Sequence, residues 1–420
     1  MTCRELVCHS QRQGWRRIAF IGASKHAGKT TALNAFVAAA ADLGLSLGLT
    51  SIGFDGEATD ALSGIGKPRI WAPAGTLVAS ADAALAASSA RLEYLEELPI
   101  STPLGPVLVA RVLADGYVVL AGVRRRRDVA LALTVLTRHG SELMLVDGAF
   151  ARIAAASPGL IDAVVVAVGA VLGGGPEQVA QQAMGFLQRF RLPETPDAWR
   201  LRLETAVERR CPAVWVAERL HVGHGRVDLP DLFAAHLDEV EQVGVFKQSG
   251  TGVVQAGGSD CPGIVRQQEI VRQVVRQPVQ QVGLFTPGAP TDDILHGLLA
   301  RWRQLSAQPS ARSARDEVAG GRTEPILHLV AQHPAQVLAS GEAMAAWLRA
   351  GHELSVWSGL PLAAIAVNPH HPFGEHLSSL ALCRALQAGV PGVPVFDAAA
   401  GYAALRDESG TEGRFASDQD

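Results

Sequence analysis

The sequence predicts an α/β protein built on a mostly parallel sheet. Three apolar runs carry this prediction: residues 18–21, 142–146 and 161–168. Each is short and nearly free of polar residues, which is typical of strands buried on both faces. Stretches with helical periodicity lie between the runs, and this favours strands joined by crossover helices.

The first run leads into a small-residue loop and then a helix. The loop reads Gly22-Ala23-Ser24-Lys25-His26-Ala27-Gly28-Lys29-Thr30-Thr31. This order of strand, loop and Gly-Lys-Thr is the signature of a P-loop NTPase, with Ala23 in the usual glycine place. Backbone N–H groups of such a loop and of the helix start bind phosphate. All ten residues are therefore predicted to bind a nucleotide, ATP or GTP. Lys29 would reach the β- and γ-phosphates, and Thr30 would ligate Mg²⁺. The alternative is a chance Gly-Lys-Thr in a surface turn.

The helix after this loop is predicted from its apolar stripe. Leu33, Phe36, Val37 and Ala40 recur at helical spacing, and Gly44 is placed to end the helix.

Three acidic residues follow predicted strands and are candidates for the metal and for catalysis. Asp55 and Glu57 come after the strand predicted at 45–52, and Asp147 ends the run at 142–146. Because ligands bind at the carboxyl ends of strands in open α/β sheets, these acids are placed to meet Mg²⁺ or an attacking water. Asp55 and Asp147 are the metal candidates, and Asp55 and Glu57 join Lys29 as catalytic candidates. A solvated turn is an equal alternative for residues 55–57.

The region between these acids is predicted to hold further elements. Residues 70–76 read as an extended segment closing on Gly75-Thr76, and residues 79–98 as a helix. Residues 106–113 and 116–123 read as two strands joined by a hairpin turn. Four consecutive arginines, Arg124 to Arg127, are interpreted as a charged, solvent-facing helix start.

The sequence divides into five predicted parts. They are a nucleotide-binding domain at 1–190, an irregular middle region at 191–305, a linker at 306–324, a C-terminal α/β segment at 325–405 and a disordered tail at 406–420. In the C-terminal segment, a strand at 362–367 leads into Asn368-Pro-His-His-Pro-Phe-Gly374. The histidines there, with His376, could ligate a metal, but two prolines favour a rigid loop.

Composition excludes several classes of protein. The chain has 420 residues, 19% of them charged, and a net charge of −4, which favours neither nucleic acid nor a membrane surface. Its five cysteines are scattered, as in a reduced cytoplasmic protein. The first residues lack the apolar core of a signal peptide, and no apolar run is long enough to span a membrane. A cytoplasmic location is therefore predicted.

Several short strings together resemble one family. They are Gly22–Thr31, Leu49–Glu57, Lys67-Pro-Arg with Gly75-Thr76, Val146–Ala149 and Val367–Gly374. This combination resembles the P-loop subunit of the reactivating system found with lysine 5,6-aminomutase and related adenosylcobalamin-dependent aminomutases. The resemblance covers about residues 15–180 and 282–400, and not 191–281. It implies a nucleotide-driven chaperone that lets an aminomutase exchange damaged cobalamin, together with a second ATPase subunit.

Two other functions stay open. One is a biosynthetic P-loop ATPase that phosphorylates a carboxylate, like dethiobiotin synthetase or the cobyrinate amidotransferases. The other is a non-catalytic nucleotide-binding scaffold. A G-protein is disfavoured because no Asn-Lys-x-Asp motif is present. A partner-driven switch would need loops that respond to the γ-phosphate, for which residues 55–57 and Gly75-Thr76 are the candidates.

Overall fold

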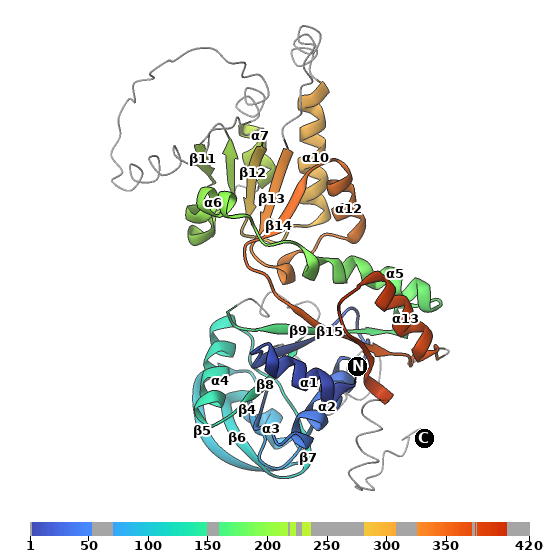
Figure 1. Ribbon diagram of the computed structural model, residues 1–420. Coiled ribbons are helices and arrows are strands. Elements are labelled where there is room, and N and C mark those ends of the chain that lie inside the picture. Colours follow the sequence, from blue (N-terminus) through green and yellow to red (C-terminus); the bar gives the residue numbers. More distant parts are fainter. Residues whose placement is uncertain are drawn as a thin grey trace. The chain divides into compact units, whose positions relative to one another are not determined.

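The computed structural model describes residues 2–52, 70–148, 159–216, 219–223, 229–236, 281–307, 326–371, 374 and 376–400. The chain forms two compact units (Figure 1). Unit 1 comprises residues 1–191, 333–335 and 359–420, and unit 2 comprises residues 192–332 and 336–358. The segment predicted as one C-terminal part, 325–405, is therefore divided between the units. The predicted tail at 406–420 and nearly all of the predicted linker lie outside the described residues.

Unit 1 is built on a nine-stranded sheet in the order β16-β15-β9-β1-β8-β2-β4-β6-β5. The strands are β1 (Arg17–Gly22), β2 (Leu47–Ile52), β4 (Leu77–Ala81), β5 (Arg91–Thr102), β6 (Gly105–Ala114), β8 (Leu143–Gly148), β9 (Ala163–Gly169), β15 (Leu362–Asn368) and β16 (Val395–Asp397). From β16 to β4 all pairs are parallel, whereas β6 is antiparallel to both β4 and β5. The predicted α/β class with a mostly parallel sheet is confirmed.

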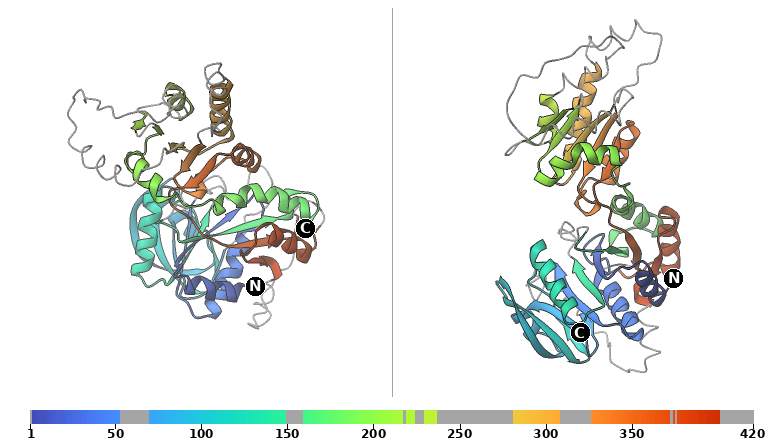
Figure 2. Two further views of the ribbon diagram at one scale, coloured as in Figure 1. Left: turned by 45° about the horizontal axis from the view of Figure 1, so that its top comes forward. Right: turned by 60° about the vertical axis from the view of Figure 1, so that its left-hand side comes forward.

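Helices cover both faces of this sheet (Figures 1 and 2). Helices α1 (Cys3–Arg12) and α2 (Lys29–Asp42) share one apolar cluster with Ile18 and Phe20 of β1. Helices α4 (Arg126–Arg138), α5 (Pro176–Leu187) and α13 (Ser379–Gly389) share another with Ala19 and Ile21. The alternation along β1 follows from the period of two in a strand, and burial on both faces explains its continuous apolar run.

The smaller elements of unit 1 are α3 (Asp82–Ala86) and the 3₁₀ turns η2 (Ala170–Leu172), η3 (Gln188–Arg191) and η4 (Pro334–Gln336), the last of which extends one residue into unit 2. Strands β3 (Ile70–Ala72) and β7 (Gly116–Val118) pair with each other as a two-stranded ribbon.

Two predictions for residues 79–123 are wrong. The predicted helix at 79–98 is instead β4, the short α3 and most of β5. Its alanine-rich start favours a helix locally, but β4 is buried between β2 and β6, so sheet pairing overrides propensity. The predicted hairpin of 106–113 with 116–123 does not form either, because β6 pairs with β4 and β5 while β7 pairs with β3. Pairing of this kind depends on residues far along the chain.

Unit 2 has a five-stranded sheet in the order β11-β10-β12-β13-β14. Its strands are β10 (Ala213–Val216), β11 (Arg219–Val222), β12 (Gln281–Thr286), β13 (Ile326–Ala331) and β14 (Glu353–Val356). Helix α6 (Asp197–Arg209) packs on one face through Trp199 and Leu203. Helices α7 (Leu229–Ala235), α10 (Asp292–Ala307) and α12 (Gly341–Arg349) share the apolar cluster of the other face. Helices and strands therefore occupy much of residues 191–305, which were predicted to be irregular. None of the helices in the described ranges is long and apolar enough to cross a membrane.

Candidate functional site

The carboxyl ends of the central parallel strands bring loop 22–31 and Asp147, two parts of the predicted site, to one edge of the sheet. Strand β8 lies between β1 and β2. Asp147 of β8 is paired in register with Phe20 of β1 on one side and with Ser51 of β2 on the other. The loop that leaves β1 and the carboxylate that ends β8 therefore share this edge, which is where open α/β sheets bind ligands.

The backbone of loop 22–31 contains left-handed residues, which also occur in anion-binding turns. Ala23 N–H donates to Ala167 O of β9 over 2.8 Å, which fixes the start of the loop. His26 has φ +60° and Gly28 has φ +92°, so two residues are left-handed within three positions. Helix α2 begins at Lys29, and no side chain caps its first turn. Its first N–H groups and the positive end of its dipole therefore point toward the loop.

Lys29 and Asp147 form an ion pair at this edge. Lys29 Nζ lies 2.9 Å from Asp147 Oδ1, and their side chains are 22% and 18% exposed. The first turn of α2 places the lysine beside the end of β8. Because both groups are largely removed from water, the pair balances two charges that would be costly alone. The predicted phosphate-binding lysine and the predicted metal-binding acid are thus direct neighbours.

Two serine hydroxyls at this edge lack hydrogen bonds. Ser24 Oγ in the loop and Ser51 Oγ at the end of β2 are buried and have no partner among the described residues. Leaving a buried hydroxyl unpaired costs about 1–3 kcal/mol. Such atoms favour a site that takes a polar ligand or water. Thr30, half-buried in the first turn of α2, adds a third hydroxyl next to Lys29.

Close backbone packing holds the loop against β9 and β15. A Cβ atom on Gly169 would lie 2.9 Å from Ala27 Cα, and one on Gly28 would lie 2.4 Å from Asn368 Cβ. Glycine is therefore required at both positions for the loop to approach the ends of these strands. The sequence did not indicate these contacts or the place of Ser51. The apolar runs identify the strands, and only their order in the sheet reveals which strand ends meet.

Other predicted site residues are not placed at this edge. Asp55 and Glu57 lie outside the described residues. Gly75-Thr76 precedes β4, which is parallel to β2, so these residues lie at the opposite, amino edge. Gly75 N–H donates to Val112 O there. The prediction that Gly75-Thr76 responds to a γ-phosphate is therefore wrong, because these residues lie at the start of β4 and Lys29 lies at the edge where the parallel strands end. Arg124 to Arg127 are exposed around the start of α4, as interpreted.

The residues at this edge fit a magnesium-bound phosphate better than a metal held by protein alone. Among the residues that the structure describes, no three His, Cys, Asp or Glu side chains gather as a metal site. Mg²⁺ needs only one or two protein oxygens when phosphates and water supply the rest. Asp147 and Thr30 can supply them, and the unpaired Ser24 hydroxyl adds a polar contact.

No protein-family model, curated protein or solved structure matches the chain.

Proposed function

We propose that this protein is a Mg²⁺-dependent P-loop nucleotide-binding protein and NTPase that acts as a reactivating chaperone for an adenosylcobalamin-dependent aminomutase. The observation that carries the nucleotide part is the Lys29–Asp147 ion pair beside a left-handed loop and an uncapped helix start. The chaperone part rests on the sequence resemblance alone.

Each part of the site has a role in this proposal. The N–H groups of loop 22–31 and of the first turn of α2 would hold the β-phosphate, since they are fixed before the ligand arrives. Lys29 would leave Asp147 for the β- and γ-phosphates. Asp147 and the Thr30 hydroxyl would hold Mg²⁺, which neutralises charge developing on the transferred phosphoryl group. The ion pair would thus be the resting arrangement of two side chains that a magnesium nucleotide separates.

We prefer an NTPase driven by a protein partner to a biosynthetic enzyme because of what a biosynthetic reaction would require. Phosphorylating a carboxylate needs a second constellation that holds the acceptor beside the γ-phosphate. In the sequence, we recognise no motif that pairs a nucleophile with its base and no cysteine in the setting of an amidotransferase. A protein partner would supply such contacts from outside. The companion ATPase subunit is part of the proposal on the same basis.

The test is phosphate release by the purified protein with ATP and Mg²⁺. We expect slow basal release that an aminomutase carrying inactivated cobalamin increases at least tenfold when the companion subunit is present. The same assay with small carboxylic acids is the counter-test. Stimulation by an acid and none by the proteins would favour a biosynthetic enzyme, and tight nucleotide binding with no turnover under any condition would favour a scaffold.

A matched pair of variants ties any turnover to this site. Lys29→Ala removes the cation that would meet the phosphates, whereas Arg209→Ala removes an exposed cation at the end of α6 in unit 2. Loss of turnover in the first variant and its persistence in the second are expected.

A further inference from the structure

The loop that follows β15 carries three histidines, and two of them converge. His370 Nδ1 lies 3.3 Å from His376 Nδ1, with the ring centroids 4.6 Å apart and the ring planes at 81°. Both side chains are exposed. The Nδ1 atoms of His370 and His376 therefore approach each other at the surface of unit 1. Neither histidine has a role in the proposed nucleotide site.

Backbone contacts hold this arrangement. Leu377 N–H donates to Pro369 O over 3.0 Å, which closes the loop around the two histidines. His370 N–H donates to Asn368 Oδ1 over 3.2 Å, which ties the loop to the end of β15. The fixed φ of Pro369 adds stiffness. Hydrogen bonds thus join the backbone on the two sides of these rings and connect His370 to the end of β15.

The distance between the two nitrogens is the one a metal ion imposes. Zinc binds imidazole nitrogen at about 2.0–2.1 Å in a tetrahedral arrangement, which places two such nitrogens about 3.3 Å apart. A direct hydrogen bond between the rings is the other way to fill this space. At an exposed position such a bond contributes only about 0.5–1.5 kcal/mol, because water competes for the same atoms.

We infer that His370 and His376 form an open binding site for a divalent transition metal ion of the kind that imidazole prefers, such as Zn²⁺. Both would coordinate through Nδ1, and the exposure of the rings leaves the remaining positions to water or to another molecule. His371 is left out of this site because its ring lies against Gly374, where an added Cβ would be 2.7 Å from its Nδ1. The inference rests on the geometry of the loop and is independent of the proposed nucleotide function.

The experiment is a zinc titration of the untagged full chain without nucleotide, using a colorimetric chelator as competitor. We expect one zinc ion per chain. His370→Ala and His376→Ala should each weaken its affinity at least tenfold, since each removes one of two protein ligands. His296→Ala, which removes an exposed histidine from α10, is the matched control and should leave it unchanged.

A spectroscopic readout separates coordination from indirect effects. Histidine nitrogen chemical shifts should show that zinc binds at Nδ1 of both rings and leaves the proton on Nε2. Failure of the wild-type chain to take up zinc, or equal uptake by the wild type and both loop variants, would overturn the inference. Because these rings lie in an exposed loop, circular dichroism and thermal unfolding should show that both variants keep the fold.

Discussion

Replacing Asp147 by asparagine tests the ion pair at the centre of the proposed site. In the structure Lys29 Nζ is 2.9 Å from Asp147 Oδ1, so an arriving phosphate must compete with the carboxylate for the lysine. Asp147 Oδ1 accepts no hydrogen bond in this pair, so charge attraction alone holds the contact, and exposed ion pairs contribute about 0.2–1 kcal/mol. Because each side chain is only about one-fifth exposed, the upper end, about 1 kcal/mol, is appropriate here.

The substitution should therefore act in opposite directions with and without magnesium. Without Mg²⁺, nucleotide affinity should rise by up to about fivefold, because about 1 kcal/mol is gained and 1.4 kcal/mol is a factor of ten. With Mg²⁺, the gain in affinity that the metal brings should shrink. Turnover should fall by at least about a hundredfold, since the metal acts mainly on charge that develops in the transition state.

The assay is calorimetric titration of nucleotide with and without Mg²⁺, together with phosphate release. Asp42→Asn is the matched control, because it removes the same charge from the far end of α2. If Asp147→Asn keeps both its magnesium dependence and its turnover, Asp147 is only a strand end. Asp55 or Glu57 would then be the better metal candidate.

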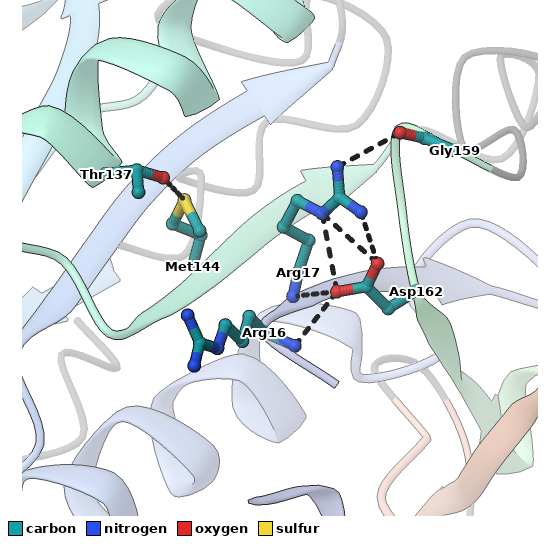
Figure 3. A network of polar contacts seen from close by, with 6 residues as sticks. All are labelled: Arg16, Arg17, Thr137, Met144, Gly159 and Asp162. Atoms are coloured by element: carbon teal, nitrogen blue, oxygen red, sulfur yellow. Dashed lines mark hydrogen bonds and ion pairs between the residues drawn. The ribbon is translucent and has the colours of Figure 1, made fainter. Parts of the chain in front are cut away.

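Three further predictions concern the framework of the fold. Gly28→Ala should lower the free energy of unfolding, measured in urea, by about 1–3 kcal/mol more than Gly44→Ala does. Both glycines have positive φ, but only a Cβ on Gly28 would meet a neighbour, Asn368. Equal losses would refute that contact. Asp162 accepts hydrogen bonds from the backbone N–H groups of Arg16 and Arg17 over 2.9 Å each and pairs with the Arg17 guanidinium (Figure 3). Asp162→Ala should therefore lower the free energy of unfolding by about 2–4 kcal/mol. It should leave nucleotide affinity unchanged, because these groups lie at the amino edge of the sheet. A change in affinity with intact stability would contradict this. Burial lowers the pKa of His333, helped by the Arg126 charge, and that of His352, each to about 4. Because each histidine is protonated at a higher pH in the unfolded chain than in the folded one, the free energy of unfolding should fall as the pH drops from about 6.5 to 4, by up to about 3 kcal/mol per histidine. His352→Gln should make this pH dependence less steep. An unchanged slope would argue against a buried neutral ring.

Local sequence signals were sufficient where an element is defined by its own residues. The run 18–21, the loop and the helix stripe from Leu33 to Ala40 predicted β1 and α2, because burial on both faces and helical spacing leave direct marks in the sequence. Gly44, with φ +72°, follows the end of α2 as expected. The same reasoning placed Asp147 at the end of a strand.

Signals failed where an element depends on its neighbours. The alanine-rich residues 79–87 favour a helix, but β4 is one strand of a buried sheet whose partners lie about 30 residues away on either side. The place of Asn368 beside Gly28 could not be predicted, because it requires β15 to join β9, almost 200 residues earlier in the chain. Ser51 was missed for a related reason: only the register of β2 with β8 puts it next to Asp147.

The most direct test of the nucleotide site at Lys29 is calorimetric titration of magnesium ATP into the wild-type chain and the Lys29→Ala variant, with Arg209→Ala as the control. We expect one nucleotide per chain for the wild type and the control. The affinity of Lys29→Ala should be at least tenfold weaker, a loss of about 1.4 kcal/mol, with the fold intact by circular dichroism. Equal affinity of the wild type and Lys29→Ala, or no binding by the wild type of either ATP or GTP, would contradict this expectation.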